Sequence, residues 1–451
     1  MIANINNQKT TNLNLLQSCS HPQDSVDHVN DYFASVGKRL AEKITSGHGD
    51  IDKAIKQNIN SIPILSNTFV LSETDNREVE ITLKLLKDDC AVGWDSIPAK
   101  VLKSSSNVLV PLMTHICNLS FRSGIFPESF KIDIIHPIHK GGNMDSVNNY
   151  RPISVLPAMS KILEKLINAR LIKFFAKYNI LSDNQYGFRM NRSTQDAILN
   201  LTDTVVRKLD SNYKCIGIFL DLAKAFDTVS IPTLLDKLER VGFRDGSLKL
   251  FNSYLTNRQQ MVRIGDHSST LKTVNFGVPQ GSILGPSLFL VYINDLCNLN
   301  ISKGSIISFA DDTTLIFHGE SWEDVARTAE NGLKAVTEWL RSNLLTLNDT
   351  ERDETLFGAT LGDKIKASKD IEKQGSQIRK VATSQKMNTP QASSSRPAPP
   401  GNWSGPPRYS SNMGGRGGQR KVTSTRGRTY PPAHPPARSY NQPKTRAQPP
   451  Q

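Results

Sequence analysis

Two apolar runs in the second half of the chain are rich in strand-forming residues and flank a pair of acids. Residues 306–309 and 313–317 contain mostly β-branched, aromatic and aliphatic side chains, and Asp311 and Asp312 stand between them. This pattern predicts a β-hairpin with both carboxylates at its turn. Adjacent carboxylates in an apolar setting repel each other, and a bound cation would offset that repulsion.

A third carboxylate follows another apolar run. Residues 214–220 read as a central strand, and Asp221 comes directly after it. A strand that delivers Asp221 beside a hairpin that carries Asp311 and Asp312 would form a site for two hard divalent ions, which prefer oxygen ligands. Two ions roughly 4 Å apart can clamp the attacking and leaving oxygens of a phosphoryl displacement. The three acids are therefore the predicted metal ligands and catalytic residues of nucleotide polymerisation.

Much of the rest of the chain up to residue 345 has helical periodicity. Apolar residues recur every three or four positions in these segments, as on one face of a helix. The predicted helices are Ser25–Ile44, Val108–Ser123, Met159–Phe175, Thr233–Val241, Leu248–Leu255, Leu288–Leu296, Trp322–Leu345 and a helix with Ala197, Ile198, Leu201, Val205 and Leu209 on one face. The stretch Val79–Ser104 is also amphipathic and leads into a turn followed by a helix at Gly93–Lys100. Further strands are predicted at residues 132–140 and 260–264.

The net charge of +13 is concentrated at the C-terminal end. Residues 373–451 contain 14 Lys and Arg and no Asp or Glu, which leaves 41 basic against 42 acidic residues in 1–372. The basicity therefore belongs to the tail and is no sign of a nucleic-acid groove in the body. Five scattered cysteines without a Cys-x-x-Cys pair argue against a disulfide framework and against a zinc site.

Three segments, in order, resemble the central motifs of reverse transcriptases in the form found in non-LTR (LINE-like) retrotransposons. They are Phe219–Asp227, Gly277–Pro286 and Phe309–Asp312. The resemblance extends from Val79 to Asn348. It implies an α+β right-hand polymerase with fingers, and a palm built on an antiparallel sheet. It also implies an RNA-directed DNA polymerase that joins a dNTP to a primer 3′-hydroxyl, with Asp221, Asp311 and Asp312 holding two Mg²⁺ or, alternatively, Mn²⁺.

The same resemblance assigns two cations to the incoming nucleotide. Lys140 and Arg151 match the fingers positions that meet the triphosphate, and a planar Arg fork beside a Lys point charge suits phosphate oxygens. A solvated turn lysine is the structural alternative for Lys140.

Four further residues are assigned to the nucleotide or to the nucleic acid by resemblance. Phe226 would lie beneath the sugar and exclude a ribose 2′-hydroxyl, although a Phe beside an apolar strand can equally be core. Gln280 would hydrogen-bond a base or sugar edge. Arg189 and Gly281 would contact template or primer, with a structural salt bridge as the alternative for Arg189.

The predicted domain limits follow from these patterns. Residues 1–75 form a polar lead-in with one amphipathic helix, for which a packing role is preferred, and 76–348 form fingers and palm. Residues 349–375 are a junction segment, with Glu351 where the family has a lysine. Because the resemblance stops at Asn348, we expect a polymerase truncated after the palm, with its thumb missing.

The last predicted region, 376–451, is a basic tail rich in Pro, Gly and Arg, expected to be disordered. Gly414–Gly418 and Arg426–Arg428 resemble RNA-binding RGG segments; a solvated linker or coding remnant is the alternative. The expected partners are an RNA template, a DNA primer and dNTPs, with an element-encoded or host protein supplying missing functions. Without a signal core or an apolar span, the protein is expected to be intracellular, in nucleus or cytoplasm, and neither secreted nor membrane-bound.

Two other functions compete with polymerisation. One is a catalytically impaired, polymerase-derived fragment that binds RNA through its tail, favoured by the missing thumb. The other is a truncated gene product without function.

Overall fold

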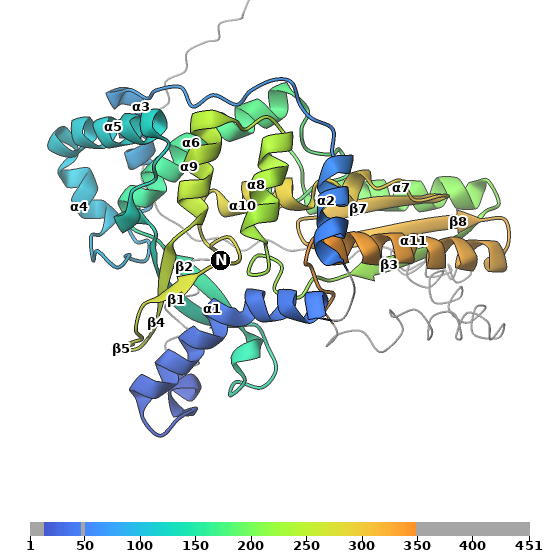
Figure 1. Ribbon diagram of the computed structural model, residues 1–451, viewed down its shortest axis with the longest axis horizontal. Coiled ribbons are helices and arrows are strands. Elements are labelled where there is room, and N and C mark those ends of the chain that lie inside the picture. The colour runs from blue at the N-terminus through green and yellow to red at the C-terminus, as the bar shows by residue number, and fades with distance from the viewer. Residues whose placement is uncertain (1–12, 47–49, 349–451) are drawn as a thin grey trace, which may run out of the picture. The chain divides into compact units, whose positions relative to one another are not determined.

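The computed structural model describes residues 13–46 and 50–348. In these residues helices outnumber strands and surround two separate sheets (Figure 1). The α-helices are α1 Pro22–Ser46, α2 Ile51–Ser61, α3 Asn76–Lys84, α4 Ala99–Ser104, α5 Ser106–Ser123, α6 Ala158–Lys177, α7 Thr194–Asp210, α8 Ile231–Arg240, α9 Asp245–Leu255, α10 Gly285–Ile293 and α11 Trp322–Ser342. The junction and tail predicted at 349–375 and 376–451 lie outside the described residues, as does any thumb that would follow.

The first sheet combines strands from two distant parts of the sequence. Its order is β2-β1-β4-β5, with β6 also paired to β4. The strands are β1 Ile132–His139, β2 Tyr150–Val155, β4 Arg258–Ile264, β5 His267–Ser268 and β6 Lys272–Val274. β1 and β4 run parallel, and the other pairs run antiparallel. β1 and β4 therefore lie between β2 and β6 in this sheet.

The second sheet is the antiparallel sheet that the sequence predicts. Its order is β3-β8-β7, with β3 Lys214–Leu220, β7 Gly304–Phe309 and β8 Asp312–Gly319. Alternate residues face opposite sides of a strand, so each side needs a cover. Leu315 and Phe317 pack with Leu333 of α11, whereas Ile316 packs on the other side with Leu201 of α7. The sheet is thus held between two helices, α7 and α11 (Figure 1).

The N-terminal region differs from the prediction of one helix in a lead-in. It contains α1 and a second helix, α2, whose Ile51, Ile55 and Ile59 are spaced i, i+4 and i+8 but of which only Ile59 is buried. The packing role predicted for the first helix is confirmed, because Val29 and Phe33 are buried against Val262 of β4. Helix α1 is therefore part of the folded body and lies against the first sheet.

Two other predictions can be compared with the structure. On α7, Ala197, Leu201 and Val205 face the sheet as predicted, but Ile198 and Leu209 are 49% and 45% exposed, because the sheet covers only a narrow stripe of the helix. All five cysteines are free thiols in this structure. Within residues 13–46 and 50–348, no helix combines the length and apolar character that a bilayer crossing requires.

Candidate active site

Three acids lie at one end of the β3-β8-β7 sheet. Asp221 follows β3, Asp312 is the first residue of β8, and Asp311 lies in the turn between β7 and β8. Strands β3 and β8 are antiparallel with Leu220 opposite Thr313, so the residue after β3 lies beside the beginning of β8. The structure therefore brings together the three carboxylates that the sequence singles out.

The turn that carries Asp311 is held by a buried glutamine. Ala310 has a φ of 59°, in the left-handed region that is costly for a residue with a Cβ. Gln185, which is fully buried, accepts a hydrogen bond of 2.9 Å from Ala310 N and donates one of 3.3 Å to Ala310 O. Both backbone groups of the strained residue are thereby satisfied, which fixes the turn beside Asp221.

Electrostatic repulsion acts within the acid cluster. Burial raises the pKa of Asp311 above its usual value, and the charges of Asp312 and Asp221 raise it further. A hydrogen bond to its own backbone and the positive charge of Arg151 lower the pKa of Asp311 and offset part of this increase. The cluster therefore has a surplus of negative charge that a cation would relieve.

The arrangement fits the magnesium ions that the resemblance implies. Among the described residues, no group of three or more His, Cys, Asp or Glu side chains could hold a metal ion by itself. Mg²⁺ usually takes one or two carboxylates and completes its shell with water and substrate phosphates. Partly exposed oxygen donors with mutual repulsion suit this partial mode of binding. Asp221 and Asp311 would be the first ligands, with the exposed Asp312 next to them.

Residues 346–348, the last that the structure describes, pair with the backbone at Asp221. Ala223 N donates to Thr346 O at 2.8 Å, and Asn348 N donates to Asp221 O at 2.9 Å. Leu222 and Leu347 form an isolated antiparallel bridge between these two bonds. Residues 346–348 therefore fix the backbone that presents Asp221.

A cleft with a volume of ≈ 640 Å³ opens at the acids. Asp221 and Asp311 border it, and three cations, Lys140, Arg151 and Lys224, line it as well. Phe226 and Gln280 also line the cleft, and α1 contributes Tyr32, Arg39 and Lys43. Six of the residues predicted for the site thus share one cleft, and its cations outnumber its carboxylates, which suits a polyphosphate or a nucleic-acid strand.

Lys224 joins the loop after β3 to the first sheet. Its Nζ donates to the carbonyl oxygens of Asn148 and Tyr150, each at 3.0 Å. Burial lowers the pKa of Lys224 to about 8, and nearby Lys140 and Arg151 lower it as well, against the opposing effect of Asp227. This residue stands inside the motif Phe219–Asp227, yet the sequence gives no sign of its partners, which lie more than 70 positions away.

Phe226 combines the two roles that the sequence leaves open. Its ring stacks on Phe289 of α10 with a centroid separation of 4.6 Å and an angle of 17°, and it meets Phe188 edge-on at 6.0 Å. It also borders the cleft. Core packing therefore fixes the position of the Phe226 ring, and the ring also borders the cleft.

Arg189 and Gly281 are placed by backbone contacts. Arg189 donates to the carbonyl oxygens of Ser182 and Gln185 at 2.5 and 3.2 Å, and it does not line the cleft. Arg189 therefore makes a structural contact, as the alternative from the sequence allows, but through hydrogen bonds to carbonyl oxygens and not through a salt bridge. Gly281 has a φ of 129°, and a Cβ there would lie 2.4 Å from Ser154 O, so close approach to β2 requires glycine.

Comparison with known families agrees with this geometry. The model of a protein family described as "Reverse transcriptase (RNA-dependent DNA polymerase)" matches residues 138–351, the stretch that carries all three acids. These residues belong to the reverse transcriptase family.

Curated relatives of this reverse transcriptase domain come from mobile elements. A probable RNA-directed DNA polymerase from transposon BS of Drosophila melanogaster is 31% identical over 278 residues, covering 60% of this chain and 31% of the relative. The corresponding protein of the X-element is 31% identical over 59% of this chain and 30% of its own length. The RNA-directed DNA polymerase of the element jockey is 28% identical over 67% of this chain and 33% of its own. The match thus spans about a third of these relatives, and the predicted resemblance to non-LTR retrotransposon enzymes is confirmed.

The structure also shows site residues that the sequence does not indicate. Lys224 and Asp227 lie inside a motif that was recognised, and Asn348 ends the recognised region, but none was given a role. Gln185, which holds the hairpin turn, reaches its partner only in the folded chain. Arg39 and Lys43 belong to the predicted helix Ser25–Ile44, whose pattern gives no sign that they line a cleft. A local pattern identifies such residues but not their partners across the fold.

Proposed function

We propose that this domain is an RNA-directed DNA polymerase of a non-LTR retrotransposon. It would transfer a nucleotidyl group from a dNTP to the 3′-hydroxyl of a DNA primer paired with an RNA template. One observation carries the proposal: Asp221 and Asp311 border the same cleft as Lys140 and Arg151. Acids that suit metal binding thus face cations that suit a triphosphate.

The cations would orient the triphosphate. Arg151 lies on β2, a strand paired along its length with β1, and Lys140 N donates to Asn149 O at 2.8 Å directly beyond that pairing. Both side chains therefore come from a rigid hairpin. The Arg151 guanidinium can bind two phosphate oxygens at once, while Lys140 adds a point charge.

Asp221, Asp311 and Asp312 would hold the metal ions at the other side of the cleft. Two bound Mg²⁺ ions would supply Lewis-acid stabilisation to the attacking and leaving oxygens. The carboxylates themselves must be ionised to act as ligands, so the raised pKa of Asp311 requires that the metal compete with a proton.

The remaining residues would select and hold the nucleotide and strands. Phe226, fixed by stacking on Phe289, would limit space beneath the sugar and favour deoxynucleotides. Gln280 would hydrogen-bond the nucleotide. Arg39 and Lys43 of α1 would attract phosphate groups at the mouth of the cleft. For Gly281 and Arg189 we propose contacts with template or primer through the backbone they shape.

Primer extension by the full chain tests this function. The assay would use an RNA template, a DNA primer, dNTPs and Mg²⁺, with Asp311→Ala and Asp312→Ala as inactivating variants. Asp203→Asn on the exposed side of α7 is a matched control that changes an acid outside the cleft. We expect extension by the unaltered chain and by Asp203→Asn only. Equal extension by all four proteins, or by none of them, would contradict the proposal.

A further inference from the structure

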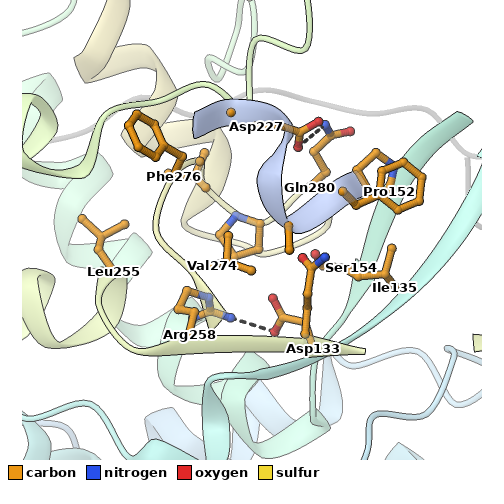
Figure 2. Close-up of a pocket in the computed structure, with 17 residues that line it drawn as sticks. Asp133, Ile135, Pro152, Ser154, Asp227, Leu255, Arg258, Val274, Phe276 and Gln280 are labelled. Carbon is orange, nitrogen blue, oxygen red and sulfur yellow. Dashed lines mark hydrogen bonds and ion pairs between the residues drawn. The ribbon is translucent and has the colours of Figure 1, made fainter. Parts of the chain in front are cut away.

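A buried carboxylate, Asp227, contacts the candidate nucleotide-binding glutamine from behind. Gln280 Nε2 donates a hydrogen bond of 2.9 Å to Asp227 Oδ1 (Figure 2). Gln280 lines the cleft, and it also lines a separate small cavity of ≈ 40 Å³ that Asp227 borders. The glutamine side chain thus stands between the carboxylate and the space proposed for the nucleotide.

The chemistry of this contact determines how the amide of Gln280 faces. An ionised carboxylate can only accept hydrogen bonds, so it commits the amide nitrogen to Asp227. The amide oxygen is then the hydrogen-bond acceptor that Gln280 presents to a ligand. We infer that Asp227 is a positioning residue that fixes the Gln280 amide so that its oxygen accepts a hydrogen bond from a hydroxyl or amino group of the incoming nucleotide. This inference rests on the proposed function.

The backbone around both residues holds this geometry closely. Val278 N donates to Phe226 O at 2.9 Å, and Gly277 N donates to Val229 O at 2.8 Å, which joins the loop of Asp227 to the loop of Gln280. Ser154 N donates to Gln280 O at 2.7 Å and joins that loop to β2. The backbones that carry the two side chains are therefore held relative to each other.

Burying the Asp227 carboxylate lowers the stability of the fold, and packing alone does not account for it. Its Oδ2 is buried and has no hydrogen-bond partner among the described residues. Burial raises the pKa of Asp227 to about 6, and the charge of Lys224 and the bond from Gln280 only partly oppose this. A group that served packing alone would be better replaced by an apolar or amide side chain.

Protonation of Asp227 would remove the constraint. A protonated carboxyl can donate to the amide oxygen, so the Gln280 amide could then turn over. The charged and titratable groups that face Asp227 are Lys224 on its own loop, Tyr32 of α1 and, across the small cavity, the ion pair of Asp133 and Arg258. Lys140 and Arg151 lie behind Lys224. Nucleotide affinity should therefore fall as the pH drops below about 6, where Asp227 gains a proton.

The test is direct binding of dTTP to the full chain in the presence of Mg²⁺, measured by calorimetry at neutral and at mildly acidic pH. We expect Asp227→Ala and Gln280→Ala each to weaken binding about tenfold, as loss of a charge-assisted hydrogen bond does. The double variant should bind no more weakly than either single variant, because both act through one amide. Asp236→Asn, an exposed acid on α8, serves as the control and should bind as the unaltered chain does.

The possible outcomes distinguish a failure of this inference from a failure of the proposed polymerase function. Multiplied losses in the double variant, or unchanged binding by Asp227→Ala, would overturn the role of Asp227 and leave the polymerase intact. No binding by the unaltered chain would overturn both. If Asp227→Ala fails to fold, Asp227→Asn keeps the shape and one acceptor; its affinity for dTTP should decline less in acid than that of the unaltered chain, because only the decline due to Asp311 remains. A decline equal to that of the unaltered chain would reject the inference.

Discussion

Asn348 Nδ2 donates a hydrogen bond of 2.7 Å to Asp221 Oδ2, across 127 positions of sequence. The bond leaves Oδ1 of the carboxylate as its freer oxygen. Together with the backbone pairing of residues 346–348 with 221–223, it sets the orientation of the acid proposed as a metal ligand. An outer residue that orients a ligand usually contributes to metal affinity and to turnover.

The first prediction concerns this contact. Asn348→Ala should lower the rate of primer extension by roughly tenfold, in the range typical for partners of metal ligands, and should raise the Mg²⁺ concentration needed for half-maximal rate. Asn348→Asp should be more harmful, since it places a second negative charge against Asp221. Rates measured over a series of Mg²⁺ concentrations provide the test. A loss that no amount of Mg²⁺ reduces would instead indicate a folding defect.

The second prediction concerns metal and pH. Because burial and neighbouring charges raise the pKa of Asp311, its ionised form is disfavoured as the pH falls. Bound Mg²⁺ should therefore raise the melting temperature more at about pH 8 than at about pH 5, since metal and proton compete for the same carboxylate. Asp311→Asn should abolish this difference, whereas Asp203→Asn should retain it. A pH-independent effect of Mg²⁺ would place the ion elsewhere.

The third prediction concerns the contact between α1 and the loop after β3. A Cβ added at Gly37 would lie 2.1 Å from Asp227 O and 2.8 Å from Phe276 Cβ. Gly37→Ala must therefore push α1 away, at a stability loss of about 1–3 kcal/mol. It should also reduce extension, because α1 lines the cleft. Lys38→Ala, on the exposed side of the same helix, removes only a surface ion pair with Glu42 and should change little.

Much of the candidate site could be predicted because its parts are local. A strand that ends in Asp221 and a hairpin that carries Asp311 and Asp312 can each be recognised within a few residues, and the resemblance implies the antiparallel sheet that joins them. The contacts that support them could not be predicted. Gln185 reaches Ala310 across 125 positions, and Lys224 reaches Tyr150 across 74. Such pairs depend on the packing of whole elements.

The N-terminal helix illustrates the same limit. Its amphipathic pattern predicts that Val29 and Phe33 are buried, and they are. The pattern does not say what they are buried against, nor that Gly37 on the next turn touches the loop of Asp227. On α7 the pattern predicts too much burial, since Ile198 fits the periodicity but is half exposed.

The last prediction concerns a buried carboxylate behind the loop of Gln280. Glu164 of α6 is fully buried and accepts hydrogen bonds from Ile283 N at 2.6 Å and Leu284 N at 3.3 Å, directly before α10. Burial raises its pKa from 4.5 to about 6, more than these bonds lower it. The folded state then binds a proton more tightly than the unfolded chain does. Stability should therefore fall as the pH rises from about 4.5 through about 6, by roughly 2 kcal/mol from this group.

Glu164→Gln isolates that contribution, because the amide oxygen can still accept from both backbone groups. The raised pKa of Asp227 also makes stability fall as the pH rises. The pKa values of His136 and His318 are lowered by burial, so these groups make stability rise with pH. The comparison must therefore be between variant and unaltered chain, by urea unfolding at about pH 5 and about pH 7.5. The difference in unfolding free energy between the two pH values should change by about 2 kcal/mol in Glu164→Gln. It should not change in the exposed control Glu338→Gln. An unchanged difference in Glu164→Gln would mean that this carboxylate is ionised at both pH values and stabilised by the start of α10 more strongly than its burial opposes.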